Sequence, residues 1–181
     1  MKIDPWRTLT RRSVLETPIF EVGSASRQHP DRDTPSEFWW VSPPDWVNVV
    51  ALTPEGEVVL VRQYRHGADA VTLEIPGGQL DAGEEPLVAA ARELREETGF
   101  VCDSLEVIGA IEVNPAFMTN RCTTVLGRGA RQTADQEFDE HEELAVELKS
   151  VGAFFEAIDS GEIDHGIVVS AAYFLTRALG R

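Results

Sequence analysis

Cysteine is scarce in this chain. Among its 181 residues only Cys102 and Cys122 are cysteines, and no Cys-x-x-Cys spacing links them. Such a pair argues against a disulfide framework and against a zinc cluster built from cysteines. We therefore expect both thiols to be small residues of the core rather than reactive groups.

Positive charge and long apolar runs are also lacking. The chain has 16 Lys and Arg against 31 Asp and Glu, a formal net charge of −15. A surface of this sign repels DNA, RNA and anionic lipid, so we expect no nucleic-acid partner. No apolar run approaches the ~18–20 residues that span a bilayer. The N-terminal MKIDPWRTLTRR lacks the apolar segment of a signal peptide. We expect a cytoplasmic protein without a membrane partner.

What is present suits one folded domain with a small extension. Apolar residues make up 43% of the chain, which is enough to fill a core, and there is no internal repeat. Near the N-terminus, VLETPIFEV and EFWWV are rich in strand-forming residues, and the loop QHPDRDTPS separates them. WVNVVALT and EVVLVRQY then flank the turn Pro54-Glu55-Gly56, which predicts a hairpin of two partly buried strands.

The second half of the chain mixes strands and helices. SLEVIGAIEV, RCTTVLGRGA and LAVELKSV read as strands, the last with the option of running into a helix. Residues 131–143 form a polar, acidic stretch that predicts a loop. VGAFFEAIDSG predicts a short helix that Gly161 ends, and residues 167–179 predict a last helix. Strands and helices in this order favour an α/β/α sandwich.

The clearest helix signal covers residues 85–98. Pro86 suits a first helical turn, because its missing N–H would be unpaired there, and Gly99 supplies the stop. At ~100° per residue one face of this helix is predicted to meet the core, and it carries Leu87, Ala91, Leu94 and Thr98. The acidic residues fall on roughly the opposite face: Glu93, Glu96 and Glu97.

Three carboxylates at i, i+3 and i+4 repel one another and weaken a plain surface helix. One interpretation is a solvated acidic face that Arg92 and Arg95 screen. The other is a site for Mg²⁺ or Mn²⁺, because these ions prefer oxygen ligands. Pro76-Gly77-Gly78 precedes the helix, and glycines let a backbone approach a ligand closely, so a carbonyl near Gly77 is a candidate further ligand.

The spacing of these residues resembles the Nudix box. Gly78 is followed after five residues by Glu84, and after seven more by Arg92-Glu93-Leu94; the pattern closes with Glu96-Glu97 and Gly99-Phe100. The resemblance implies an α/β fold, the Nudix α/β/α sandwich with a mixed sheet, over residues 46–181. Residues 1–45 are then an N-terminal β extension. The family's reaction is hydrolysis of a nucleoside diphosphate linked to another group.

The flanks resemble the branch of ADP-ribose and nucleoside diphosphate sugar pyrophosphatases. VRQYR and LEIPGG precede the box in a similar way, and Pro115 lies fifteen residues beyond Phe100. The resemblance implies Mg²⁺-dependent cleavage of a nucleotide sugar to a nucleoside monophosphate and a sugar phosphate. Alternatives are a GDP-mannose or other NDP-hexose hydrolase, a hydrolase of oxidised triphosphates, and a non-catalytic Nudix sensor of nucleotide sugars.

Roles for individual residues follow from the same resemblance. Magnesium ions, or manganese, are expected on Gly77, Glu93, Glu96 and Glu97, and the acidic stretch QEFDEHEEL is expected to close over them. From the spacing of DEHEEL, Glu140 matches the general base and Glu142 matches a further metal ligand. Glu143 is a near neighbour, so the assignment among these three glutamates stays open. The catalytic set is therefore Glu140, Glu97 and Glu93, while Glu84 and Arg92 have supporting roles.

Substrate contacts and assembly are the remaining expectations. Arg62 and Arg65 are candidates for the sugar or phosphates. Candidates for stacking on the base are Trp39, Trp40 and Trp46. Core packing or a subunit interface is the alternative for each tryptophan. In the resembling enzymes the N-terminal strands exchange between two subunits, so residues 1–45 are expected to be the dimerisation region of a homodimer.

Overall fold

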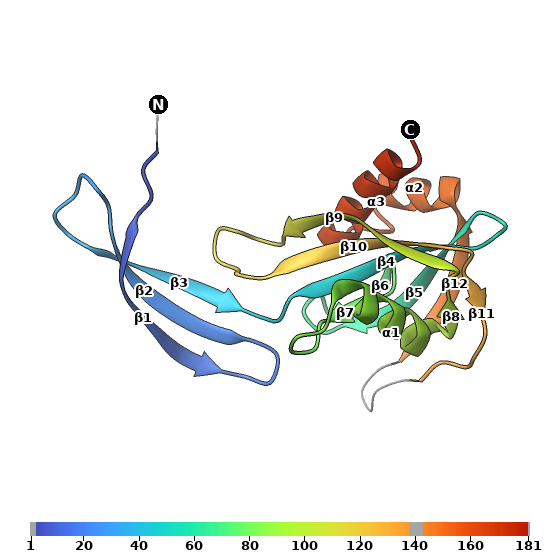
Figure 1. The fold of residues 1–181 in the computed structure, drawn as a ribbon, viewed down its shortest axis with the longest axis horizontal. Coiled ribbons are helices and arrows are strands. Elements are labelled where there is room, and N and C mark those ends of the chain that lie inside the picture. The colour runs from blue at the N-terminus through green and yellow to red at the C-terminus, as the bar shows by residue number, and fades with distance from the viewer. Residues whose placement is uncertain (1–2, 138–142, 181) are drawn as a thin grey trace. The chain divides into compact units, whose positions relative to one another are not determined.

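The computed structural model describes residues 3–137 and 143–180, which divide into two compact units. Unit 1 comprises residues 1–44 together with 112–121, and unit 2 comprises residues 45–111 together with 122–181. Figure 1 traces both along the chain. In the part of the chain that the structure describes, no helix is long and apolar enough to cross a bilayer.

Unit 1 is an antiparallel sheet in the order β1-β2-β3. Its strands are β1 (Arg7–Glu16), β2 (Glu21–Gln28) and β3 (Ser36–Ser42). The segment VLETPIFEV is not continuous strand, because a turn divides it at Thr17–Phe20. There the Thr17 hydroxyl accepts hydrogen bonds from the backbone N–H groups of Ile19 and Phe20, at 3.3 and 3.0 Å, and Pro18 offers no N–H for a ladder. The turn lets β1 and β2 pair.

One tryptophan forms most of the interior of this sheet. Trp40 is 8% exposed and lies over Gly23, where a Cβ would come within 2.0 Å of its ring. The guanidinium of Arg11 lies 4.1 Å from the same ring, a cation–π contact. By contrast, β1 is exposed along its whole length. Unit 1 therefore has a thin core.

Within the residues that the structure describes, unit 2 is built on a seven-stranded sheet. Its main path is β12-β5-β4-β10-β9, with β6 paired to β5 and β7 paired to β4. Strand β10 runs parallel to β4, whereas β5 and β7 run antiparallel to it, so the sheet is mixed. The strands are β4 (Trp46–Leu52), β5 (Glu57–Arg65), β6 (Ala70–Glu74), β7 (Gly77–Gln79), β9 (Ser104–Glu112), β10 (Arg121–Arg128) and β12 (Leu144–Ser150).

Helices cover both faces of this sheet (Figure 1). They are α1 (Pro86–Thr98), α2 (Val151–Asp159) and α3 (Gly166–Ala178). Alternate residues of β4 separate into two cores: Val47 and Val49 pack with α1, whereas Val50 and Leu52 pack with α2 and α3. This alternation is the period of two expected of a strand buried on both faces. The predicted α/β/α sandwich and its β4–β5 hairpin are confirmed.

The boundaries of α1 agree with the prediction, but its orientation does not. Gly99 ends the helix in the left-handed conformation, with φ 72°. Leu87 is 40% exposed and Ala91 is also exposed, although both were predicted to face the core. The buried residues are instead Ala89, Ala90, Leu94, Glu97 and Thr98. The small alanines let the helix lie close to β4, and this contact turns one of the three glutamates inward.

The two cysteines are core residues, as expected. Cys122 is buried and Cys102 half-buried, and burial raises the pKa of Cys122 to about 12 and that of Cys102 to about 11. Both thiols therefore stay protonated near neutral pH. One short pairing was not predicted: within the acidic stretch 131–143, β11 (Arg131–Gln132) pairs with β8 (Phe100–Val101).

Candidate active site

The site begins at β7, which pairs with β4 and precedes α1 in the chain. Asn48 pairs with Gly77 and Val47 with Gly78 in the β4–β7 ladder. A Cβ on Gly77 would lie 2.3 Å from the Val47 carbonyl oxygen, so only glycine allows this approach. The glycines therefore bring bare backbone up to the carboxylates of α1.

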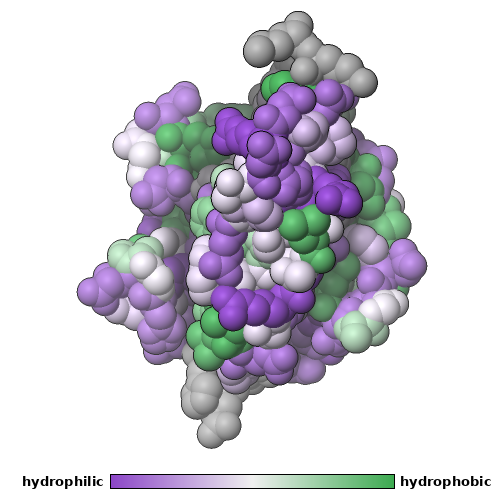
Figure 2. Space-filling model, turned by 90° about the vertical axis from the view of Figure 1, so that its left-hand side faces the viewer, coloured by the Kyte–Doolittle hydropathy of each residue, from purple (hydrophilic) through white to green (hydrophobic). Residues whose placement is uncertain are grey.

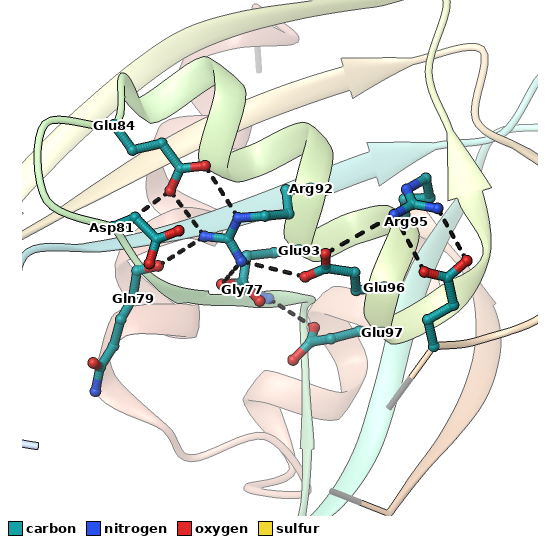
Figure 3. Close-up of polar contacts among 10 residues, drawn as sticks. Gly77, Gln79, Asp81, Glu84, Arg92, Glu93, Arg95, Glu96 and Glu97 are labelled. Carbon is teal, nitrogen blue, oxygen red and sulfur yellow. Dashed lines mark hydrogen bonds and ion pairs between the residues drawn. The ribbon is translucent and has the colours of Figure 1, made fainter. Parts of the chain in front are cut away.

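Two glutamates of α1 contact this backbone. Glu97 is 4% exposed, and its Oε2 accepts a hydrogen bond from the Gly77 N–H at 2.9 Å. The Glu93 carboxylate lies against Gly78, where a Cβ would come within 2.4 Å of Oε1. Figure 3 shows Glu93, Glu96 and Glu97 on the side of α1 that faces Gly77. The backbone thus sets the positions of two carboxylates.

Arg92 connects the acidic residues. Its Nε and Nη2 donate to the two oxygens of Glu84 at 3.0 and 2.9 Å, a bidentate pair. Its Nη1 donates to Glu93 Oε1 at 2.8 Å and to Glu96 Oε2 at 3.3 Å. The supporting roles expected of Glu84 and Arg92 agree with these contacts, because the arginine orients carboxylates (Figure 3).

The charges of this cluster reinforce one another. Hydrogen bonds from Arg92, together with one from the Asp81 N–H, lower the pKa of Glu84 to about 2. Hydrogen bonding to Glu84, with a further contribution from Glu93, raises the pKa of Arg92. Both groups are therefore charged near neutral pH, and the Arg92–Glu84 pair is a fixed part of the site.

The acidic stretch that follows β11 is tied to the C-terminal end of α1. The Glu137 N–H donates to the Glu96 carbonyl at 2.9 Å, and Gln136 Nε2 donates to the Glu97 carbonyl at 2.6 Å. The predicted base Glu140 and ligand Glu142 lie outside the described residues. Glu143 is described and is exposed. The last described residues before this gap thus lie beside two of the α1 glutamates.

The donors fit a divalent cation, although no centre is assembled. Within residues 3–137 and 143–180, no three acidic, histidine or cysteine side chains are arranged to hold a metal ion. Arg92 Nη1 instead lies between Glu93 and Glu96, so oxygens of both already neutralise one cation. Carboxylate oxygens are also the ligands that Mg²⁺ and Mn²⁺ prefer. The chemistry of the donor set matches a hard divalent ion.

A cavity of about 280 Å³ adjoins the same β7 backbone. Two of the predicted substrate residues, Arg65 and Trp46, line it. Arg62 does not line it and instead pairs with Glu147 and Glu162, at 2.7 and 2.6 Å. Trp39 belongs to unit 1, where it is 53% exposed. The cavity walls are Trp46, Val47, Asn48, Arg65, Glu74, Ile75, Gly77, Gly78, Gln79, His165, Ile167 and Val168.

Apart from Arg65, sequence reasoning missed the polar residues of this cavity. Glu74 is 2% exposed and accepts hydrogen bonds from Arg65, Thr72 and His165, at 2.7–3.0 Å. Burial opposes ionisation of Glu74, but the hydrogen bonds from His165, Arg65 and Thr72 outweigh it and hold its pKa below the ordinary value. The one signal in the sequence was a lone glutamate in the apolar strand VTLEI.

Comparisons with known proteins show which sequences this chain resembles. A family model described as NUDIX domain matches residues 42–165. The ADP-ribose pyrophosphatase of Bacillus subtilis (strain 168) is 33% identical over 124 residues, which are 68% of this chain and 67% of that protein. The methanol dehydrogenase activator of Bacillus methanolicus is 43% identical over 74 residues, 41% of this chain and 40% of that protein.

Two further comparisons concern sequence and fold. The ADP-ribose pyrophosphatase of Mycobacterium tuberculosis (strain ATCC 25618 / H37Rv) is 38% identical over 103 residues, 56% of this chain and 49% of that protein. A crystal structure of an ADP compounds hydrolase superposes with a TM-score of 0.87, covering 99% of this chain and 97% of the other at 20% identity. This structural likeness concerns the fold.

Proposed function

Because this chain belongs to the Nudix family, we propose that it hydrolyses the pyrophosphate bond of nucleoside diphosphate sugars, with ADP-ribose as its first substrate. The products are a nucleoside monophosphate and a sugar phosphate. The observation that carries this proposal is the row of α1 carboxylates held against the Gly77–Gly78 backbone. The names of two relatives, both ADP-ribose pyrophosphatases, support the choice of substrate.

A divalent cation is part of the proposal. Nudix hydrolases generally use divalent metal ions, and a chain of net charge −15 needs cations to approach a pyrophosphate. We propose that Glu93, Glu96, Glu97 and the Gly77 carbonyl bind the cation. Mg²⁺ is the expected ion and Mn²⁺ is the alternative. When bound there, it supplies charge stabilisation at the phosphate oxygens and a more acidic water.

The chain's own residues position this chemistry. The Gly77 N–H holds Glu97 in place, and Gly78 leaves room for the Glu93 carboxylate. Glu140 is proposed as the general base that takes the proton from the attacking water, and Glu142 as a further ligand. The described neighbours of this segment, Gln136 and Glu137, bond the α1 backbone at Glu97 and Glu96, which supports the assignment.

Substrate contacts are proposed in the cavity beside β7. Trp46 offers a flat ring for a base or sugar, and Arg65 carries a positive charge that Glu74 holds at the cavity wall. Arg62 is already neutralised by two carboxylates, so we give it a supporting role next to Glu147 and Glu162. Trp39 and residues 1–45 are proposed to act in a homodimer.

The test is product analysis. The protein is incubated with Mg²⁺ or Mn²⁺ and a panel of ADP-ribose, NDP-hexoses, dinucleotides and nucleoside triphosphates, and products are separated by chromatography. We expect AMP and ribose 5-phosphate from ADP-ribose, and no product after chelation of the metal. Preferred cleavage of GDP-mannose or another NDP-hexose would reassign the substrate. Turnover that ignores the chelator, or none on any nucleotide sugar, would refute the proposal.

A further inference from the structure

The cavity beside β7 contains a buried acceptor that the fold does not use. Asn48 is 2% exposed and lines the cavity, and its Nδ2 donates to the Ile167 carbonyl at 3.4 Å. Within the described residues, its Oδ1 has no hydrogen-bond partner. A buried oxygen without a donor destabilises the fold, so the position is explained better by a ligand than by folding.

His165 is a second hydrogen-bonding side chain that lines the cavity. Nδ1 of His165 lies 2.7 Å from Glu74 Oε2. Glu74 is ionised, so this nitrogen carries the hydrogen and donates it. In the neutral imidazole the other nitrogen, Nε2, is then an acceptor. Glu74 is buried and also accepts from Arg65 and Thr72, so the histidine ring is held on one side by a fixed carboxylate.

These polar atoms select the chemistry of a ligand. Asn48 Oδ1 accepts hydrogen bonds, as Nε2 of an imidazole ring does when Nδ1 carries the hydrogen, while Arg65 Nε and Nη2 are already bonded to Glu74. A phosphate only accepts, so it gains nothing from Asn48. A neutral group with O–H or N–H donors satisfies the buried oxygen. The apolar walls Ile75, Ile167 and Val168 and the ring of Trp46 suit the flat face of a sugar or base.

We propose that Asn48 and His165 form a specificity site for the neutral end of the substrate, which they recognise through its hydrogen-bond donors. The proposal rests on the nucleotide-sugar function above. Two parts of such a substrate carry these donors: the hydroxyl groups of the sugar and the exocyclic amine of the base. Asn48 pairs directly with Gly77 in the β4–β7 ladder, so the specificity site and the carboxylates share one piece of backbone.

The experiment measures binding, which requires no hydrolysis. Calorimetry in the presence of Mg²⁺ compares AMP with purine riboside 5′-monophosphate, which has a hydrogen atom in place of the base amine. A second pair compares ribose 5-phosphate with 2-deoxyribose 5-phosphate, which lacks one hydroxyl. We expect the wild type to prefer the donor-bearing member of one pair by about tenfold, the value of one hydrogen bond to a buried group. Asn48→Leu, of similar size, should remove that preference.

Controls separate recognition from folding. Thr124 is the neighbour of Asn48 in the β4–β10 ladder, is equally buried and does not line the cavity, so Thr124→Val should keep the preference. Asn48→Leu should melt at or above the wild-type temperature, since it removes an unpartnered buried oxygen. If it does not fold, His165→Leu is measured instead, with His165→Gln as the variant that retains part of the preference.

The results of this binding experiment can be told apart from those of the product analysis that tests the proposed function. A preference in the AMP pair assigns the base to the cavity, and one in the sugar phosphate pair assigns the sugar. Equal binding within both pairs, no saturable binding to the wild type, or a preference that survives in Asn48→Leu would each overturn the specificity site. A protein that shows the preference without cleaving any nucleotide sugar would keep the site and refute the proposed hydrolase.

Discussion

Among the acidic residues of α1, Glu97 is the one whose carboxylate is buried. Its oxygen accepts the Gly77 N–H at 2.9 Å, and the side chain is 4% exposed. A buried negative charge beside a row of other carboxylates is costly unless a cation balances it. Burial therefore holds this carboxylate against the β7 backbone, although the sequence predicted Glu97 on the face opposite the core.

Glu97→Gln tests the proposed role of this residue as a metal ligand. Glutamine keeps the size of the side chain and an oxygen that accepts the Gly77 N–H, so the melting temperature should change by only a few degrees. Loss of the charge should lower kcat by at least about 100-fold, because even indirect partners of metal ligands cost 10–100-fold. Glu156 is an exposed glutamate on α2, and Glu156→Gln should leave both quantities unchanged. Normal turnover in Glu97→Gln would remove the residue from the site.

At the scale of elements, the end of α1 is fixed by Gly99. This residue has φ 72°, and a Cβ there would lie 2.1 Å from the Ala134 carbonyl oxygen. The Thr133 and Ala134 N–H groups also donate to the Gly99 carbonyl. One glycine thus ends the helix that carries the carboxylates and anchors Thr133 and Ala134 beside it.

Gly99→Ala should therefore destabilise the folded protein more than the same substitution at another glycine of similar backbone conformation. Gly161 follows α2 with φ 81° and has open space around it, so Gly161→Ala bears only the left-handed strain of about 1–2 kcal/mol. Gly99→Ala should cost at least about twice that amount, because backbone must also move. Urea unfolding of both variants measures the difference. Equal losses would mean that segment 131–137 does not pack on the helix end.

The network that joins β6 to the start of α3 should show in the pH dependence of stability. Glu74 has a lowered pKa in the folded state, so it binds a proton less readily there than in the unfolded chain. Its stabilising contribution is complete above the ordinary carboxyl value of 4.5 and is lost as the pH falls below it. The wild type should exceed Glu74→Gln in unfolding free energy near neutral pH, and the gap should narrow between pH ~5 and ~3.

Urea titrations at several pH values measure this gap. Glu156→Gln is the matched control, because its carboxylate is exposed on α2 and its curve should run parallel to the wild type. A gap that stays constant with pH would show that Glu74 stabilises by shape alone.

The sequence was sufficient for features that depend on neighbours along the chain. Pro86 and Gly99 located both ends of α1, and Gly56 located the β4–β5 turn, since caps and turns depend on a few adjacent residues. The face that α1 buries depends on its packing against β4, so spacing alone placed Leu87 and Ala91 wrongly. Asn48, Glu74 and His165 come from three distant segments, and no periodicity relates them.

At the scale of the whole molecule, the charge is unevenly divided. Unit 1 holds seven basic and seven acidic residues and is neutral, so the entire net charge of −15 belongs to unit 2. In the view of Figure 2, hydrophobic side chains interrupt a mostly hydrophilic surface. Unit 1 exposes a group of large apolar residues in spite of its thin core: Leu9, Val14, Leu15, Ile19, Phe38 and Trp39. A neutral unit that exposes apolar side chains is suited to contact a second chain.

We therefore expect a homodimer held by unit 1. Light scattering after size exclusion should give twice the chain mass, and the double variant Leu15→Asp with Trp39→Asp should give the monomer, since buried charges oppose the contact. Tyr173 on α3 is 62% exposed in unit 2, so Tyr173→Asp is the matched control and should remain dimeric. Because β1 and β3 are largely exposed, the double variant should keep its melting temperature at low protein concentration. A wild type that is monomeric at micromolar concentration, or a double variant that stays dimeric, would place the interface elsewhere or remove it.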